Sequence, residues 1–538
     1  MGKKRKRTIP PAALFVGAFI LAVAAIVLAF VLWPRDRSRK TQGAGPVHTS
    51  ADTFAASLLY TCDLQGRLLP VACEEPDGPL GGIGRLATLL KTWGTQRSDR
   101  VIVDVGNAVV VNHKQADAIN QLLYKAFDTM GYAVVNCGEN EAALSLDRLK
   151  DLTKDRQVQM ISANLFNVKD NKPVFPTYHV VQVSNVRIGF IGILDPNIAP
   201  MKVGTGMRIG APADGLKSAL VAVQEKADMV VVLAYLSPDE IYKIARKFSG
   251  IHLILGGRCQ ATSAPYELAG RTLIAYLGDE GCTVGRIDDA SFPKPQPPHP
   301  TLPPYAAGRV ALLDKAVPSD ASMAPILAEL QTALGGEKPP GAEWDPRMPC
   351  TSSFVGSDVC KLCHIKEFYA WQNTDFHAGS YATLIQETER TRAKDKSKTP
   401  KETPSLAKSP ACLLCHVTGY GMPGGYDPDK HKLDQPATAP TAKDEGPPKT
   451  KEALKGIGPV RQYQLANVGC EACHGGARRH LGVAIKAKFD VPKAPQLRVP
   501  LAARTCVRCH HGNRPCLDPG KSEPFEMEEY LPKIKHWP

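Results

Sequence analysis

Four copies of the pentapeptide Cys-x-x-Cys-His in the last third of this chain constrain its fold more than any other feature. They span residues 360–364, 412–416, 470–474 and 506–510. A zinc site or a redox-active Cys-x-x-Cys pair could account for one such pentapeptide, but four at one spacing are typical of covalent haem c attachment. Both thiols then bond to one porphyrin, and the adjacent histidine ligates the iron. The sequence therefore predicts a domain built around four covalently attached haem c groups.

Each residue of these motifs has a predicted role. Thioether bonds to haem are expected at Cys360, Cys363, Cys412, Cys415, Cys470, Cys473, Cys506 and Cys509. The proximal iron ligands are expected to be His364, His416, His474 and His510. The candidates for the distal iron ligands, in order of preference, are His377, His480, His536 and His431. Since the first three are the stronger ones, one of the four irons is left with an open position in this prediction.

The N-terminus has the features of a membrane signal anchor. A basic cluster, Lys3 to Arg7, lies within residues 1–10, and the uncharged, largely apolar residues 11–33 follow. Such a run is long enough to span a bilayer. A cleaved signal peptide is the alternative, but its apolar region would be shorter and would end at small residues. The basic cluster predicts a cytoplasmic N-terminus. We therefore expect a single-pass protein of the inner membrane whose bulk, after a linker at 34–52, is periplasmic, where haem c is attached.

The formal net charge of +13 does not indicate a nucleic-acid partner. Part of it lies in the N-terminal cluster, and the ionised propionates of four haems would offset the basic excess of the C-terminal segment. No aromatic or basic motif for nucleic acid accompanies it. The partners we expect are redox proteins or a membrane quinol oxidoreductase, and the sequence leaves the oligomeric state open.

Between the linker and the haem motifs, strand and helix patterns alternate. Strands are predicted at 57–61, 101–105, 133–136, 160–163, 187–192, 229–233 and 253–255, with helices at 83–93, 117–130 and 212–226. A proline-rich spacer at 292–305 precedes a strand at 309–313 and a helix at 321–334. This alternation predicts a layered α/β domain over 53–335. A linker at 336–352 then leads to a mainly α haem domain of low secondary-structure content, at 353–538.

The α/β domain resembles the metallophosphoesterase half of periplasmic 5'-nucleotidases. The segment Thr61-Cys62-Asp63-Leu64-Gln65-Gly66 looks like the family's Thr-Asn-Asp-x-His-Gly, and the later motifs follow in the family's order. The resemblance implies a site for two metal ions, yet this chain departs from it. Asp63 remains, while the family's metal histidines correspond to Gln65, Tyr235, Arg258 and Gln260, its bridging aspartate to Asn107, its asparagine ligand to Glu139 and its catalytic histidine to Asn140. Such side chains do not rebuild a two-metal site, so we expect no phosphohydrolase activity and a docking or scaffold role.

Cysteines outside the haem motifs leave two interpretations open. Cys62, Cys137 and Cys259 each lie in a degenerate motif loop, and Cys73 lies just downstream of the first. Structural disulfides or inert thiols are expected in an oxidising compartment. A redox relay or a soft-metal site is the alternative.

The haem domain resembles the tetrahaem cytochrome c-554 family. The resemblance depends on the sequence segments around the haem motifs. They include Val355-Gly356-Ser357, His377-Ala378, Asn467-Val468-Gly469 with His480, and Tyr530 to His536. It implies electron transfer and makes the second haem the five-coordinate one. Two alternatives remain. One is a haem enzyme acting on a small nitrogen or sulfur species at an open iron, and the other is a nucleotide- or metal-sensing α/β module that gates the haems.

Overall fold

The structure is a computed structural model that describes most of the α/β domain and part of the haem domain. The described residues are 57–72, 78–95, 100–183, 186–198, 201–259, 266–269, 272–278, 281–288, 307–342, 354–361, 364–394, 405–430, 462–474, 476–477 and 480–481. The predicted anchor at 11–33 and the linker at 34–52 lie outside them. Within the described ranges, no helix is both long enough and apolar enough to cross a membrane.

The first sheet of the α/β domain has six strands in the order β14-β13-β1-β2-β3-β4. Strands β1 to β4 are parallel, β13 is antiparallel to β1, and β14 is antiparallel to β13. Their bounds are Ser57–Thr61 (β1), Arg100–Asp104 (β2), Val134–Asn136 (β3), Gln159–Ile161 (β4), Thr283–Asp288 (β13) and Ala307–Leu312 (β14). The predicted strands at 57–61, 101–105, 133–136, 160–163 and 309–313 are confirmed to within two residues, and the last completes this sheet.

The second sheet also has six strands, in the order β11-β12-β10-β9-β7-β6. Strands β7, β9, β10 and β12 are parallel, and β6 and β11 are antiparallel edge strands. Their bounds are Tyr178–Val183 (β6), Val186–Leu194 (β7), Met229–Tyr235 (β9), Leu253–Gly256 (β10), Glu267–Ala269 (β11) and Thr272–Tyr276 (β12). The short strands β5 (Leu165–Asn167) and β8 (Met207–Ile209) form a separate pair.

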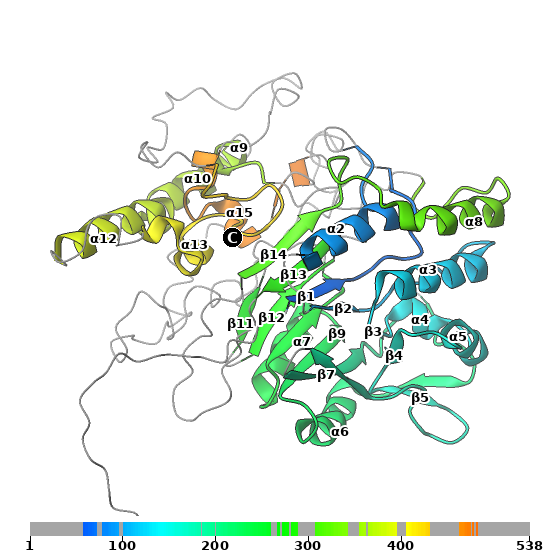
Figure 1. The fold of residues 1–538 in the computed structure, drawn as a ribbon. Helices are drawn as coiled ribbons and strands as arrows, with labels where there is room; N and C mark the ends of the chain where they lie inside the picture. The colour runs from blue at the N-terminus through cyan, green and yellow to red at the C-terminus, as the bar shows by residue number, and fades with distance from the viewer. Residues whose placement is uncertain are drawn as a thin grey trace, which may run out of the picture. The chain divides into compact units, whose positions relative to one another are not determined.

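The two sheets pack face to face, with helices on their outer faces (Figure 1). The side chains of β9 alternate between the two faces of its sheet, because successive side chains of a strand point to opposite faces. Val231 and Leu233 belong to the large core shared with the first sheet, whereas Val230 and Val232 pack with helix residues on the other face. Helices α6 (Pro212–Gln224) and α7 (Pro238–Lys247) cover the second sheet, and α2 (Ile83–Thr95), α3 (Ala116–Met130) and α8 (Ala324–Leu334) lie with the first. The predicted α/β layers are confirmed.

The described part of the haem domain consists of helices without strands, and most of these helices are short. These are α9 (Ser357–Cys360), α10 (Ile365–Gln372), α11 (Asp375–Ala378), α12 (Ser380–Lys394), α13 (Pro410–His416) and α15 (Cys470–His474), with the 3-10 turns η2 (Leu406–Lys408) and η3 (Gln462–Leu465). Helix α13 ends at the histidine of the second haem motif, and α15 spans the third. This agrees with the predicted mainly α character.

Candidate sites: a closed phosphoesterase-like centre and the haem motifs

Five residues of the degenerate phosphoesterase-like motifs meet at one end of the two sheets. Asp63 follows β1, Asn107 follows β2, Glu139 begins α4 (Glu139–Ala143) after β3, Tyr235 ends β9 and Arg258 follows β10. These strands are parallel within their sheets. The carboxyl ends of parallel strands are where α/β proteins place their ligand sites. The fold therefore gathers these motif residues into one site.

The Asp63 carboxylate accepts hydrogen bonds from neighbouring side chains. Tyr235 donates its hydroxyl to Oδ1 of Asp63 at 2.6 Å, and the Asn107 side-chain amide donates to the same oxygen at 2.7 Å. The Cys62 thiol donates to Oδ2 at 3.6 Å. Oδ1 of Asn107 in turn accepts the backbone N–H of Asn140 at 2.9 Å. The polar groups of this cluster thus satisfy one another.

Arg258 supplies a positive charge beside this cluster. Its Nε lies 2.6 Å from Oε1 of Glu139, and its Nη1 lies 2.6 Å from Oδ2 of Asp195. Burial raises the pKa of Glu139, and the guanidinium opposes that shift. Asp195 was not anticipated from the sequence, although it directly follows a buried strand, β7.

Glu141, a residue of α4, holds the motif loops in place by binding their backbone N–H groups. Its carboxylate is fully buried and accepts N–H groups from Asn107 at 2.9 Å, Ala108 at 2.8 Å, Val109 at 3.0 Å and Gly138 at 2.8 Å. Asn107 has a positive φ of 63°. Left-handed backbone is unfavourable for a residue with a side chain, and it persists where the surroundings fix it. Glu141 therefore ties the loop after β2 to the loop after β3.

The donor set of this centre does not fit a pair of metal ions. Amide, phenol and guanidinium groups occupy the positions at which the resembled family has metal ligands, and Arg258 already neutralises two carboxylates. Among the described residues, no group of three or more His, Cys, Asp or Glu side chains is arranged to hold a metal ion. Gln260 lies outside the described residues.

The buried thiols of these loops are in surroundings that disfavour thiolate chemistry. Cys62 and Cys137 are thiols with exposed fractions of 1% and 0%. Burial raises the pKa of both, and the carboxylates of Asp63 and Glu141 add to the shifts of Cys62 and Cys137, respectively. The thiolate is the reactive and metal-binding form, so these shifts disfavour thiolate chemistry at both residues. Cys259 is buried nearby, and Cys73 lies outside the described residues.

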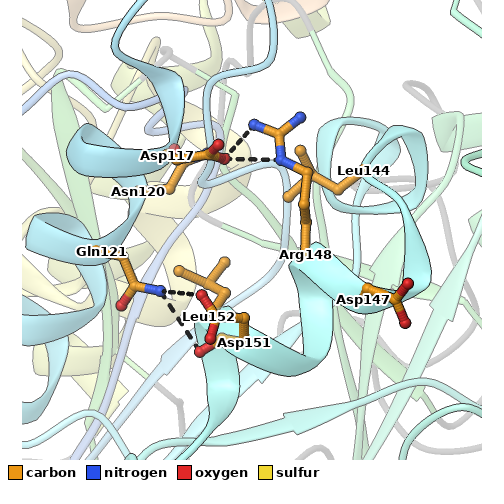
Figure 2. A pocket seen from close by; sticks show the side chains of 8 residues that line it. All are labelled: Asp117, Asn120, Gln121, Leu144, Asp147, Arg148, Asp151 and Leu152. Atoms are coloured by element: carbon orange, nitrogen blue, oxygen red, sulfur yellow. Dashed lines mark hydrogen bonds and ion pairs between the residues drawn. The ribbon is translucent and has the colours of Figure 1, made fainter.

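A cavity of about 330 Å³ lies between α3 and α5 (Leu146–Thr153) (Figure 2). Asp117, Asp147 and Asp151 line it together with Arg148, whose Nε donates to Asp117 at 2.7 Å. None of the degenerate motif residues lines this cavity. It is therefore separate from the phosphoesterase-like centre.

Hydrogen bonds hold the ring of His416, the predicted proximal histidine of the second haem motif. Nδ1 of His416 lies 2.8 Å from the backbone oxygen of Ser380, the first residue of α12, and 3.3 Å from the Thr383 hydroxyl. An Nδ1–H bond to a carbonyl sets the tautomer and leaves Nε2 for a metal. Burial lowers the pKa of His416, which favours the neutral, ligating imidazole. This geometry fits the predicted proximal role, and the contact with Ser380 was not anticipated.

The histidine of the first haem motif lies opposite a predicted distal ligand. The ring centroids of His364 and His480 are 6.1 Å apart with an interplanar angle of 37°. Metal–imidazole bonds are about 2 Å long, so two rings at this separation leave room for one metal ion between them. Nδ1 of His480 is buried without a hydrogen-bond partner, as a nitrogen reserved for a ligand would be. These residues therefore fit an iron bound between two imidazoles.

His377 lies beside the segment that leads into the third haem motif. Its backbone oxygen accepts the N–H of Val468 at 3.2 Å, two residues before Cys470. Burial lowers the pKa of His377, which favours the neutral imidazole. This position suits the predicted distal role, which stays a prediction together with the roles of Cys412, Cys415, Cys473 and His474. The remaining predicted site residues lie outside the described residues: Cys363, His431, Cys506, Cys509, His510 and His536.

The comparisons with known proteins divide along the same boundary as the two sites. The model of the family described as Cytochrome c554 and c-prime matches residues 359–436. A cytochrome c-554 from Nitrosomonas europaea is 28% identical over 129 residues, which cover 24% of this chain and 41% of that protein. A 2',3'-cyclic-nucleotide 2'-phosphodiesterase/3'-nucleotidase from Yersinia enterocolitica is 30% identical over 168 residues, which cover 28% of this chain and 26% of that protein. The chain is a fusion of a 5'-nucleotidase-like domain and a cytochrome c554-type domain.

Both parts of this fusion are partial matches to their relatives. The chain spans less than two thirds of the Yersinia and Nitrosomonas proteins. The crystal structure of a 5'-nucleotidase precursor from Thermus thermophilus has a TM-score of 0.44 and 22% identity, covering 52% of this chain and 59% of that one. A cytochrome c554 domain implies covalently bound haem c and supports a role in haem electron transfer.

Proposed function

We propose that this protein is a membrane-anchored, periplasmic tetrahaem c-type cytochrome that carries electrons between redox partners. The observation that carries the proposal is the facing pair His364 and His480, whose rings are 6.1 Å apart, within a segment that holds repeated Cys-x-x-Cys-His motifs. Haem c, when bound, would supply a one-electron iron couple.

The cysteines and histidines of the motifs would attach and ligate the haems. Cys360 and Cys363 would form the thioether bonds at the first motif, with His364 and His480 as its axial ligands. At the second motif the Ser380 carbonyl oxygen contacts Nδ1 of His416, which would leave Nε2 of that ring to ligate the iron. His377 would ligate an iron beside the third motif. Burial lowers the pKa of His377 and of His480, which favours the neutral imidazole that an iron ligand requires.

Electron paramagnetic resonance (EPR) of the oxidised protein during a stepwise potential titration tests the electron-carrier proposal. We expect low-spin signals from haems with two axial histidines and fully reversible reduction. A high-spin signal that changes on adding nitric oxide and accompanies turnover of a small nitrogen or sulfur compound would contradict a pure carrier role.

The membrane and partner assignments form part of the same proposal. Residues 11–33 would anchor the chain in the inner membrane, with the haem domain in the periplasm, where it would exchange electrons with redox proteins or a membrane quinol oxidoreductase. Fractionation of cells that express the full chain tests this. Release of the protein by salt alone, without detergent, would contradict the anchor.

We also propose that the 5'-nucleotidase-like domain is catalytically dead and serves for docking or support. Two sets of contacts favour this. Arg258 forms ion pairs with both Glu139 and Asp195, and the Asp63 carboxylate accepts hydrogen bonds from two side chains of the protein itself. Hydrolysis of bis(p-nitrophenyl) phosphate and of 2',3'-cyclic AMP would be measured with added Mn²⁺ for wild type and for R258H. Both are expected to show only the background rate. Metal-dependent turnover by wild type would refute the assignment.

A further inference from the structure

One buried carboxylate lies between two of the haem motifs. Glu471 is the residue that follows the first cysteine of the third motif, and only 1% of it is exposed. Its position in the pentapeptide is one at which haem attachment requires no particular side chain. Burying a carboxylate is unfavourable unless hydrogen bonds compensate for the lost solvent. The contacts of Glu471 therefore indicate what its burial achieves.

Three backbone N–H groups bind the Glu471 carboxylate. Val355 donates to Oε1 at 2.9 Å, Gly356 donates to Oε2 at 2.7 Å, and Ala477 donates to Oε1 at 2.7 Å. Val355 and Gly356 directly precede α9, which carries Cys360, whereas Ala477 follows the third motif. One side chain thus connects the entrance of the first motif to both ends of the third. Hydrogen bonds to the charged form favour ionisation of a buried carboxyl group.

Neighbouring contacts bring the two motifs together at the same place. The backbone N–H of Cys470 donates to the Ser357 hydroxyl at 3.0 Å. A Cβ atom on Gly469 would lie 2.5 Å from that hydroxyl oxygen, so the approach requires glycine there. The side chains of Cys360 and Cys470 are in hydrogen-bonding contact with each other, and both lie near the Glu471 carboxylate. The attachment points of two different haems are therefore adjacent to one buried negative charge.

We propose that Glu471 is a positioning residue that joins the first and third haem motifs and lowers the reduction potentials of the two haems attached there. This inference rests on the proposed electron-carrier function. A buried negative charge disfavours the addition of an electron nearby, because low-dielectric surroundings screen it poorly. Its effect should fall off with distance, so it should act on these two haems and not equally on all four.

The test compares E471Q, E471D and E387Q in the full-length holoprotein by potentiometric titration followed by EPR. E471Q removes the charge with little change in shape, E471D keeps it, and E387Q removes the charge of a surface glutamate that pairs with Arg390. We expect E471Q to change the reduction equilibrium of two haems at least tenfold toward the reduced state, which is about 59 mV for one electron. E471D and E387Q should stay within a twofold change.

Four potentials that are unchanged in E471Q, or that all shift by the same amount, would overturn the inference. If E471Q does not accumulate as holoprotein, amide hydrogen exchange of wild type and E471D tests whether Glu471 joins the two motifs. The amides of Val355, Gly356 and Ala477 should be protected in wild type and exchange at least tenfold faster in E471D. Exchange of these amides at loop rates in wild type would equally overturn it. Failure of the carrier proposal itself looks different, since it would give protein without reversible haem reduction.

Discussion

The two candidate sites of this chain differ in how completely the protein satisfies its own polar groups. In the 5'-nucleotidase-like domain, Asp63 accepts hydrogen bonds from Tyr235 and Asn107, and Arg258 binds Glu139 and Asp195. In the cytochrome domain, Nδ1 of His480 is buried without a partner and its ring faces His364. A set of groups that bind one another has no need of a ligand, whereas a buried nitrogen without a partner is costly unless a ligand binds it.

Both domains nevertheless fix their loops by the same device. Glu141 accepts four backbone N–H groups from two motif loops, and Glu471 accepts three from the segments around two haem motifs. In each case one buried carboxylate replaces hydrogen bonds that irregular backbone cannot make with itself. The loops of the phosphoesterase-like centre are thus held by the same kind of contact as the segments around the haem motifs. This is consistent with a scaffold role for the former.

The largest expected effect is the loss of an axial ligand. H480A should convert one haem from low-spin to high-spin, because the iron bound by His364 would lose its second imidazole. EPR of the oxidised holoprotein measures the change as one low-spin signal lost and one high-spin signal gained. H113A, which removes a histidine of the α/β domain, is the control and should leave the spectrum unaltered. An unchanged low-spin count in H480A would break the contrast between the two sites.

Removal of the loop-fixing charge in the α/β domain should cost the most stability. E141Q places an amide against four backbone donors, and we expect a loss of about 3 kcal/mol in the free energy of unfolding. Urea denaturation followed by circular dichroism measures it. The matched control is E240Q, a surface glutamate bonded to Lys243, for which a change within about 0.5 kcal/mol is expected. An E141Q loss no larger than that of E240Q would contradict the role of Glu141.

Arg258 should contribute less, because 29% of its side chain is exposed and solvent screens its ion pairs. R258M would leave Glu139 and Asp195 without this cation, and we expect a loss of roughly 1 kcal/mol at pH 7. The loss should shrink as the pH falls, since protonated Glu139 needs no counter-charge. Burial already raises the pKa of Glu139 in the folded state. A loss that grows on acidification would show that another group is responsible.

Asp104 offers the smallest and most pH-specific test. Burial raises its pKa well above the usual range, although Thr61 and the backbone N–H of Gly106 oppose the shift. A folded-state pKa above the unfolded value, about 4, favours folding at low pH, and this contribution is lost as the pH rises through the folded pKa. D104N should therefore flatten the pH dependence and gain up to about 1 kcal/mol at pH 8 relative to wild type. Parallel pH profiles for the two proteins would contradict this.

The sequence predicted the parts of the fold that depend on local pattern. Continuous apolar runs marked β7 and β9, and parallel strands with intervening helices implied the layers. Contacts between distant segments could not be read in the same way. Asp195 escaped notice because it lies outside the motifs compared with the family. Glu471 occupies a variable position of its pentapeptide, where burial alone reveals a role. His480 was named as a ligand, but its pairing with His364 required the folded chain.

Every role proposed for the cytochrome domain requires covalently bound haem, and the intact mass of the purified full-length protein tests for it. The protein would be produced with a cytochrome c maturation system and measured under denaturing conditions, which leave only covalent adducts. The predicted result is a mass that exceeds the polypeptide mass by four haem increments, with each adduct mapped to one Cys-x-x-Cys-His peptide. Colourless protein at the bare polypeptide mass would contradict the account.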